Sequence, residues 1–367
     1  MKALLRDEIE VNKFAQEIKL QPFKVKQIFF EIFKNQNIEI DQMTTLSKDL
    51  REELKTKFDP LSIKMKDMVE DGQTTKFAFE THDGKIIESV IIYHRQKEQH
   101  VKDNKAKLNR ITLCISSQVG CPMGCSFCVT GKLGFTRNLT RDEIISQILY
   151  ANNYIKNKFG KKEDGTLFGV RNVVFMGMGE PLANYDNVKK SIEIMLAQDR
   201  LSLGRRHITI STVGVVKGIQ RMIDDELTVK LAISLHAPNQ KLREEIIPVA
   251  KGTELGDLMK VIKDYIKATD NRIFYEYIMI KDLTDKPELA MELSKLVKGQ
   301  LSHINLIPYN ENPAMKYFHE SPEGNIRKFK EILEKEGVTV TIRDSMGREA
   351  KGACGQLGWE KVSSDNE

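Results

Sequence analysis

Between residues 108 and 345, short runs of apolar and β-branched residues alternate with longer stretches in which apolar positions recur at helical spacing. The longer stretches predict helices, for example at 142–155, 187–197 and 255–268. The short runs predict strands at 110–117, 172–178, 207–214, 229–236, 272–280, 303–309 and 338–343. Alternation of strands and helices on this scale predicts an α/β fold built of βαβ units around a parallel sheet, open or closed into a barrel.

The earlier part of the chain has a different pattern. Residues 22–36 and 44–58 read as amphipathic helices, the second opening on a Ser/Thr cap. Residues 76–94 hold two alternating runs around Asp83-Gly84, which predicts a β-hairpin. The basic stretch 95–110 reads either as an exposed linker or as a merely solvated connector. We therefore expect an N-terminal helical accessory domain (1–75), a β-hairpin with a basic linker (76–107), a barrel domain (108–345) and a C-terminal segment (346–367).

Composition places the chain among ordinary globular proteins, with 40% hydrophobic and 30% charged residues. The N-terminus carries charges through its apolar stretch and lacks a small-residue cleavage site, so it does not read as a signal peptide. No run approaches the ~18 consecutive apolar residues of a membrane span. We expect a cytoplasmic protein, in which free thiols persist. The net charge of +5 suits a polyanionic partner without demanding one.

Four of the five cysteines lie between residues 114 and 128, which favours metal binding or thiol chemistry over a disulfide framework. Cys121, Cys125 and Cys128 form a CxxxCxxC loop after the first expected barrel strand. Three thiolates can each hold one iron of a [4Fe–4S] cluster, whose fourth iron stays open for an outside ligand such as the methionine end of S-adenosylmethionine. One electron from the cluster can then break the sulfonium C–S bond and release a 5′-deoxyadenosyl radical.

The alternative for this loop is a structural zinc site, which usually takes paired CxxC or His ligands and closes four positions. The unequal spacing and Phe127 before the last cysteine weigh against zinc. With this motif at its first strand, the sheet predicts a partial parallel (β/α) barrel of the radical SAM type.

Further polar residues fall at the carboxyl ends of the expected strands, which form the catalytic face of barrel folds. Gly177 and Gly179 would let the backbone approach a ligand, and Glu180 could accept from its amine. Each residue also has a plainer explanation, as a turn former or a structural histidine. The candidates for binding S-adenosylmethionine are Gly179, Glu180, Ser211, Ser234, Leu235, His236 and Asn310.

Several segments together resemble the RlmN/Cfr family of radical methyl synthases, from about residue 20 to residue 357. They are 114–140, FMGMGEPLANY (175–185), HITISTVG (207–214), LAISLHAP (231–238), INLIPYN (304–310) and ACGQL (353–357). Cys114 and the ACGQL cysteine, Cys354, are absent from ordinary radical enzymes that share CxxxCxxC. The segment 345–357 departs somewhat from the acidic run that usually precedes ACGQL in the family.

The resemblance implies methylation of an adenine ring carbon in RNA. Adenine C2 lies between two ring nitrogens and is too poor a nucleophile for ordinary methyl transfer, whereas a carbon radical can add to it. By analogy with the family, Cys354 takes a methyl group from one S-adenosylmethionine, and a second supplies the radical that activates it. Cys114 then resolves the protein–RNA adduct and ends in a disulfide with Cys354, and Glu88 matches the family's proposed proton acceptor. The alternatives are that Cys114 is a buried strand cysteine, that Cys354 is a bystander and that Glu88 is a solvent-facing charge.

The family implies its substrates and partners as well. Its C2 enzymes act on 23S rRNA in the peptidyl transferase centre, and many also act on the tRNA adenosine beside the anticodon. Cfr-type members methylate C8 and confer antibiotic resistance, but Glu180-Pro181 and Val119 look like the C2 type. A reducing donor such as flavodoxin or ferredoxin is implied, and a monomer is the default expectation.

Basic residues are candidates for contacts with RNA phosphates, which add salt-dependent affinity without reading sequence. The target adenine must leave its stack to reach a buried radical, so flipped or loop adenines are the natural substrates. From a different class of protein, a non-catalytic iron–sulfur or zinc RNA-binding protein is the alternative. The candidate contacts are Lys24, Lys26, Lys102, Lys105, Lys107, Arg110, Arg205 and Arg206.

Overall fold

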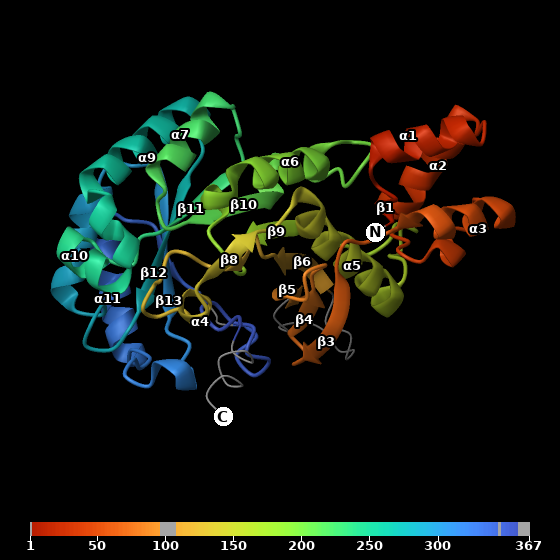
Figure 1. The fold of residues 1–367 in the computed structure, drawn as a ribbon. Coiled ribbons are helices and arrows are strands. Elements are labelled where there is room, and N and C mark those ends of the chain that lie inside the picture. The colour runs from red at the N-terminus through yellow and green to blue at the C-terminus, as the bar shows by residue number, and fades with distance from the viewer. Residues whose placement is uncertain (1, 96–107, 344–345, 359–367) are drawn as a thin grey trace.

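The computed structural model describes residues 2–95, 108–343 and 346–358. The basic linker at 96–107, with Lys102, Lys105 and Lys107, lies outside the described residues. Within the described residues, a ten-stranded sheet runs through the molecule in the order β14-β13-β12-β11-β10-β9-β6-β5-β4-β3 (Figure 1). The strands of its parallel part are β6 (Leu108–Cys114), β9 (Asn172–Phe175), β10 (Ile208–Thr212), β11 (Lys230–Ser234), β12 (Ile273–Met279), β13 (Ser302–Pro308) and β14 (Val340–Ile342).

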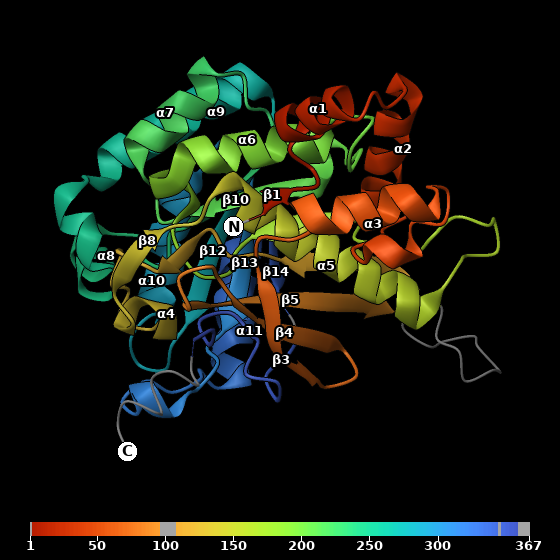
Figure 2. The same ribbon diagram turned by 45° about the vertical axis from the view of Figure 1, so that its right-hand side comes forward.

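Helices link the parallel strands and pack on the outer face of the sheet (Figures 1 and 2). Most apolar residues of these helices and strands share one buried core, and a second, smaller cluster includes Ile246 and Ile278. This architecture confirms the expected α/β fold, and the predicted strands and the helices named above are all present with ends shifted by a few residues. The helices are α4 (Val129–Lys132), α5 (Arg141–Phe159), α6 (Tyr185–Leu196), α7 (Val216–Asp224), α8 (Gln240–Ile246), α9 (Leu255–Thr269), α10 (Pro287–Val297) and α11 (Glu323–Lys335).

An antiparallel extension continues the sheet beyond β6. The predicted hairpin is present as β4 (Thr74–Glu80) and β5 (Ile86–Arg95), and β5 pairs antiparallel with β6. The edge strand β3 (Lys64–Glu70) pairs with β4, although it falls within the segment expected to be purely helical. The hairpin is therefore part of the main sheet and brings Glu88 close to the end of β6.

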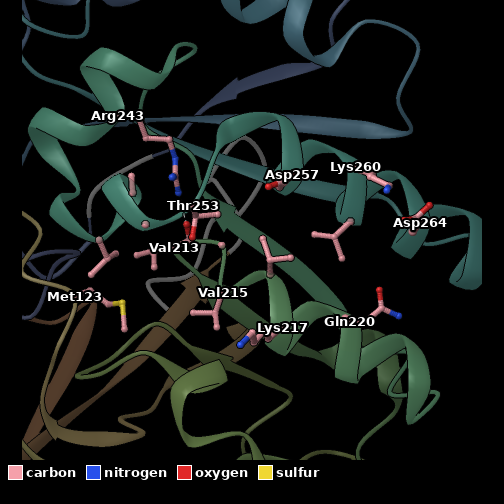
Figure 3. Close-up of a pocket in the computed structure, with 16 residues that line it drawn as sticks. Met123, Val213, Val215, Lys217, Gln220, Arg243, Thr253, Asp257, Lys260 and Asp264 are labelled. Atoms are coloured by element: carbon pink, nitrogen blue, oxygen red, sulfur yellow. Dashed lines mark hydrogen bonds between the residues drawn. The ribbon is translucent and has the colours of Figure 1, made fainter.

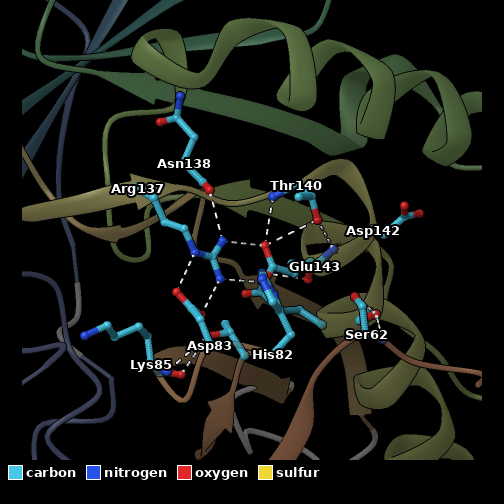
Figure 4. Close-up of polar contacts among 12 residues, drawn as sticks. Ser62, His82, Asp83, Lys85, Arg137, Asn138, Thr140, Asp142 and Glu143 are labelled. Carbon is cyan, nitrogen blue, oxygen red and sulfur yellow. Dashed lines mark hydrogen bonds and ion pairs between the residues drawn. The ribbon is translucent and has the colours of Figure 1, made fainter. Parts of the chain in front are cut away.

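A polar cluster ties the hairpin turn to the start of α5 (Figure 4). Arg137, in β8 (Phe135–Asn138), donates two hydrogen bonds to Asp83 at 2.7 and 2.9 Å and two to Glu143 at 2.8 Å each. Glu143 also closes a capping box with Thr140 at the N-terminus of α5. The hairpin, β8 and α5 are thus held by one guanidinium.

The N-terminal helices α1 (Glu8–Glu17), α2 (Pro22–Phe33) and α3 (Lys48–Lys57) gather at one end of the molecule, beside α5 and α6 (Figure 1). The short parallel pair β1 (Ala3–Leu4) and β2 (Phe58–Asp59) closes this module. The buried Arg6 connects the module to α5, where it donates to the carbonyl of Asp142 at 2.7 Å and to Ser146 Oγ at 2.9 Å. Among the described residues, no helix has the length and apolar character needed to cross a membrane.

Candidate active site

The cysteine loop begins where β7 (Gln118–Gly120) pairs with β8 and ends at α4. Gly120 has φ of +73°, and a Cβ on it would lie 1.9 Å from the carbonyl oxygen of Gly134, so only glycine fits this tight start. The Cys121 N–H donates to the same carbonyl at 2.8 Å. Farther along, the Ser126 N–H donates to the carbonyl of Ile246 at the end of α8 at 3.0 Å. The loop is therefore fixed at both ends.

The three thiols of the loop lie within electrostatic range of one another. Burial raises the pKa of Cys121 to about 12 and raises that of Cys125 well above its ordinary value, because a buried thiolate loses its hydration. Soft thiolates are the donors that iron–sulfur clusters take, and a bound cation lowers thiol pKa values. In the parts of the chain that the structure describes, no group of three or more Cys, His, Asp or Glu side chains is arranged to hold a single metal ion. In a [4Fe–4S] cluster each thiolate binds a different iron, so three cysteines need not converge on a single point. The cluster therefore remains a prediction, and it is based on the three thiol donors.

The segment Gly179-Glu180-Pro181, which follows β9, packs against Gln118 at the start of β7. Gly179 has φ of +102°, and a Cβ on it would lie 2.5 Å from the Gln118 Cβ. The missing side chain of Gly179 therefore lets its backbone approach Gln118 of the same chain closely. Glu180 accepts from the N–H groups of Leu182 and Val213 at 2.9 Å each. Burial raises the pKa of Glu180 to about 7.

The other candidates at the ends of the strands differ in what they present. Ser211 and Ser234 are half-buried. The Leu235 side chain is fully buried in the core, so only its backbone is available to a ligand. His236 adopts φ of +57°, unusual for a non-glycine residue, and its Nδ1 accepts from the Ile278 N–H at 3.1 Å. Burial lowers the pKa of His236 to about 3, so its ring is neutral.

Asn310 follows β13 and is buried, and its Nδ2 donates to the carbonyl of Cys354 at 3.1 Å. Its Oδ1 is buried without a hydrogen-bond partner, as is the Oδ1 of Asn312. An orphaned buried acceptor costs free energy unless a ligand donor reaches it. The site therefore fits a ligand with N–H or O–H donors, such as S-adenosylmethionine.

The C-terminal segment carries Cys354 to the cysteine loop. The Val129 N–H, directly after Cys128, donates to the carbonyl of Gly355 at 2.9 Å, and Thr130 Oγ1 donates to that of Leu357 at 2.9 Å. Part of the Cys354 side chain is open to solvent. The protein around Cys354 still raises the pKa of its thiol, because it removes part of the hydration of the thiolate.

Cys114 is the last residue of β6 and is buried. It interacts electrostatically with Cys354, and burial raises its pKa to about 12. Arg343, just after β14, opposes burial by lowering the pKa of both thiols. Its guanidinium lies 3.3 Å from Glu276, which also accepts from Asn305 Nδ2 at 2.9 Å. The structure thus brings the two predicted cysteines together and adds a cation beside them.

Glu88 is buried, not solvent-facing, and lines a small cavity of about 260 Å³. It forms an ion pair of 3.2 Å with the buried Lys76 and accepts from the Gly358 N–H at 2.5 Å. This carboxylate therefore anchors the C-terminal segment that carries Cys354.

The predicted RNA contacts that fall within the described residues do not gather at the thiols. Lys24 and Lys26 lie on α2, where the Lys24 ammonium is 5.2 Å from the Phe23 ring centroid. Arg110 and the pair Arg205-Arg206 lie at the amino ends of β6 and β10, the edge of the sheet opposite Cys114. These contacts remain a prediction.

Sequence reasoning missed Arg343, Glu276 and Arg243. Arg343 closes a β-branched run, and a cation at a strand's carboxyl end was an available signal. Arg243 lies in a polar stretch, QKLREE, that reads as solvated, and only the packed structure shows it buried. Glu276 is buried, and Ser234, Asn305 and Thr341 occupy the neighbouring register positions on the adjoining strands, a pairing that only the assembled sheet reveals.

Comparison with known proteins places these features in context. The Radical SAM superfamily model matches residues 115–293, and the model for the ribosomal RNA large subunit methyltransferase N-terminal domain matches residues 4–59. A probable dual-specificity RNA methyltransferase RlmN from Dictyoglomus turgidum is 40% identical over 97% of each chain. A ribosomal RNA large subunit methyltransferase N from Nitrosopumilus maritimus is 37% identical over 95% of each. The crystal structure of a radical SAM methyltransferase from Sphaerobacter thermophilus matches with a TM-score of 0.86 and 34% identity, covering 98% of this chain and 99% of that one.

Proposed function

The chain belongs to the RlmN family of radical SAM RNA methyltransferases, and from that premise we propose that it methylates C2 of adenine in 23S rRNA, at the peptidyl transferase centre, and beside the anticodon in tRNA. The observation that carries the proposal is the electrostatic interaction between Cys114 and Cys354, whose segment is bonded to the end of the cysteine loop. These residues come from distant parts of the chain, so the fold itself creates the pair.

The cofactors would be held along the catalytic edge. Cys121, Cys125 and Cys128 would hold a [4Fe–4S] cluster, which would supply the electron that cleaves S-adenosylmethionine into methionine and a 5′-deoxyadenosyl radical. The binding residues for S-adenosylmethionine would be Gly179, Glu180, Ser211, Ser234, Leu235, His236 and Asn310. Among them, the free Oδ1 of Asn310 and the buried Glu180 carboxylate offer acceptors to ligand donors.

Cys354 is the methyl acceptor in this proposal. Its thiol must lose a proton before the sulfur attacks the sulfonium methyl group, since the thiolate is the nucleophile. The sulfur then forms the new S–CH₃ bond as S-adenosylhomocysteine leaves. Arg343 assists by stabilising the thiolate against the cost of burial.

Cys114 and Glu88 complete the chemistry. After hydrogen loss from the S-methyl group, the carbon radical on Cys354 bonds to adenine C2. The adduct then loses one electron, which the cluster would take back, and Glu88 is proposed to take the proton that the base gives up. The Cys114 thiolate then attacks the Cys354 sulfur and forms the disulfide, while the S–C bond breaks and the carbon left on the base takes up a proton to become the methyl group. Glu88 is tied to the segment that carries Cys354 by its bond to Gly358, and this bond and its pair with Lys76 must loosen for it to accept a proton.

The test is mass spectrometry of ribosomal RNA and tRNA from cells that lack this gene, before and after its restoration. We expect 2-methyladenosine to return in both RNAs with the intact gene and in neither with a Cys354→Ala gene. Return of 8-methyladenosine would instead assign the C8 reaction. Unchanged methyladenosine would contradict the proposal, and return in rRNA alone would remove tRNA from the substrates.

A further inference from the structure

Arg243 is a buried cation beside the cysteine loop. It lies on α8, and its side chain is among the largest that are fully buried, with 1% exposed. Figure 3 shows it reaching from α8 toward Val213 at one end of a groove of about 610 Å³, with Met123 of the cysteine loop at the same end. The opposite end of the groove carries Lys260 and Asp264.

The Arg243 guanidinium has few partners. One terminal nitrogen donates to the carbonyl of Val213, and its Nε is buried without a hydrogen-bond partner. Throughout the residues that the structure describes, no carboxylate forms an ion pair with it. Arginine cannot shed its charge in a protein. Burial of an uncompensated charge costs several kcal/mol, so a negative group is needed to offset it.

The negative group that the surroundings offer is the cysteine loop. Arg243 interacts electrostatically with Cys125. The next residues of α8 hold the loop directly, since Ser126 bonds to the carbonyl of Ile246 and both Cys125 and Phe127 share an apolar cluster with Ile246 and Ile247. His236 packs edge-on against Phe127 with ring centroids 4.8 Å apart, but it is neutral and adds no charge.

We propose that Arg243 is the buried counter-charge of the iron–sulfur cluster and makes the cluster easier to reduce. The inference rests on the proposed function, because it requires the cluster on the three cysteines. Three thiolates and the cluster core carry net negative charge, which grows by one when the cluster takes an electron. A fixed cation at the loop therefore stabilises the reduced form more than the oxidised form. Arg243 acts through the cluster and is a positioning residue, not a catalytic one.

The experiment compares anaerobically reconstituted wild-type protein with Arg243→Met and Arg243→Lys. Lys217→Met is the matched control, because it removes a cation from the same groove that is already exposed to solvent. Iron and sulfide content are measured first, and an EPR-monitored redox titration then gives the midpoint potential. In Arg243→Met we expect about a tenfold smaller reduced fraction at a given potential, equivalent to about 60 mV more negative for one electron. Arg243→Lys recovers most of the shift, and Lys217→Met matches the wild type.

Melting of the apoprotein adds a second readout. Without a cluster, Arg243 is uncompensated, so the apo form of Arg243→Met melts at or above the wild-type temperature, whereas its loaded form melts below the loaded wild type. Equal potentials at full cluster content would overturn the proposal. Equal loss of cluster from the Met and Lys variants would also overturn it, because the charge would then be irrelevant. A wild-type chain that takes up no cluster would contradict the proposed function itself. If the variants show the expected shifts in potential but the wild type methylates no RNA, the proposed function fails and the role of Arg243 still holds.

Discussion

Among single side chains, Arg343 has the clearest consequence for the chemistry. It lowers the pKa of Cys354 and Cys114, which burial raises. Arg343→Met should therefore raise both pKa values, slow methyl transfer to Cys354 by about tenfold near neutral pH, and move the rate profile to higher pH. Mass spectrometry of the C-terminal peptide after incubation with S-adenosylmethionine measures the rate.

Arg343→Lys is the control, because it keeps the charge beside Glu276 while it changes the shape. It should recover most of the rate and return the profile toward the wild-type position. A wild-type rate and pH profile in Arg343→Met would show that the cation does not support the thiolate. The backbone of Arg343, which donates to the Leu306 carbonyl at 2.8 Å, is unaffected by either change.

Glu180 gives a prediction for pH. Its pKa is raised to about 7 by burial, against an ordinary value of 4.5. A carboxyl group with a raised folded-state pKa contributes stability that is present below 4.5 and lost as the pH rises through 7. The stability of the apo wild type relative to Glu180→Gln should thus fall by about 3 kcal/mol from pH 4.5 to pH 8. Urea unfolding at several pH values measures this, and a constant difference would contradict it.

Single residues also show what sequence can and cannot foresee. The cysteines are predictable because their spacing carries the chemistry, and Asn310 because strand ends converge in a parallel sheet. The role of Gly179 differs from expectation, since its missing Cβ makes room for Gln118. Burial of Arg243 could not be foreseen, because a polar helical stretch reads as solvent-facing until its neighbours are known.

Among strands and helices, the tie between the hairpin turn and α5 is testable through Arg137. Glu143 keeps only 2% of its side chain exposed, so loss of Arg137 leaves a buried carboxylate with fewer partners. We expect Arg137→Met to lower the free energy of unfolding by about 2–3 kcal/mol at pH 7, measured in urea. Burial alone would raise the pKa of Glu143, but hydrogen bonds from Arg137 and Thr140 lower it overall.

The pH dependence of this loss follows from the lowered pKa of Glu143. Stabilisation of a carboxylate whose pKa is lowered in the fold is present above the ordinary value of 4.5 and disappears as the pH falls through the folded-state value. The effect of Arg137→Met should therefore shrink in acid. The control is Arg327→Met, which removes an exposed i,i+4 pair with Glu323 and should change stability by less than about 0.5 kcal/mol. Equal losses for both variants would show that burial does not decide the energy.

The sequence pattern predicts the strands that are buried on both faces, but it does not reveal the exposed edge strand. The parallel strands read as continuous β-branched runs because helices and the C-terminal segment cover them. The edge strand β3 has nearly every side chain exposed, so KMKDMVE shows no alternation and gave no signal. Only its pairing with β4 makes it a strand.

The chain as a whole behaves as one body, because the N-terminal module shares its apolar core with the barrel. Polar contacts reinforce the junction. Arg200, in the turn that follows α6, lies 4.3 Å from the Phe29 ring centroid on α2 and 3.0 Å from Glu8 on α1. Lys156 on α5 also bonds to the amide oxygen of Asn37. We infer that the module positions α5, and with it the cysteine loop, as well as any surface that it offers to RNA.

Arg6 tests this coupling most directly. Its side chain is 1% exposed and donates to the carbonyls of Pro60 and Asp142 at 2.7 Å each and to Ser146 at 2.9 Å. Arg6→Met leaves these acceptors buried without their donor, so we expect a loss of about 3–5 kcal/mol. Lys13→Met, which removes an exposed pair with Glu10 in the same module, should leave the stability close to that of the wild type. Circular dichroism and limited proteolysis of the apoprotein should then report one shared transition at lower urea, because neither part retains a complete core alone. A separate early transition of the N-terminal helices in the wild type would instead show that the module folds on its own and that Arg6 only docks it.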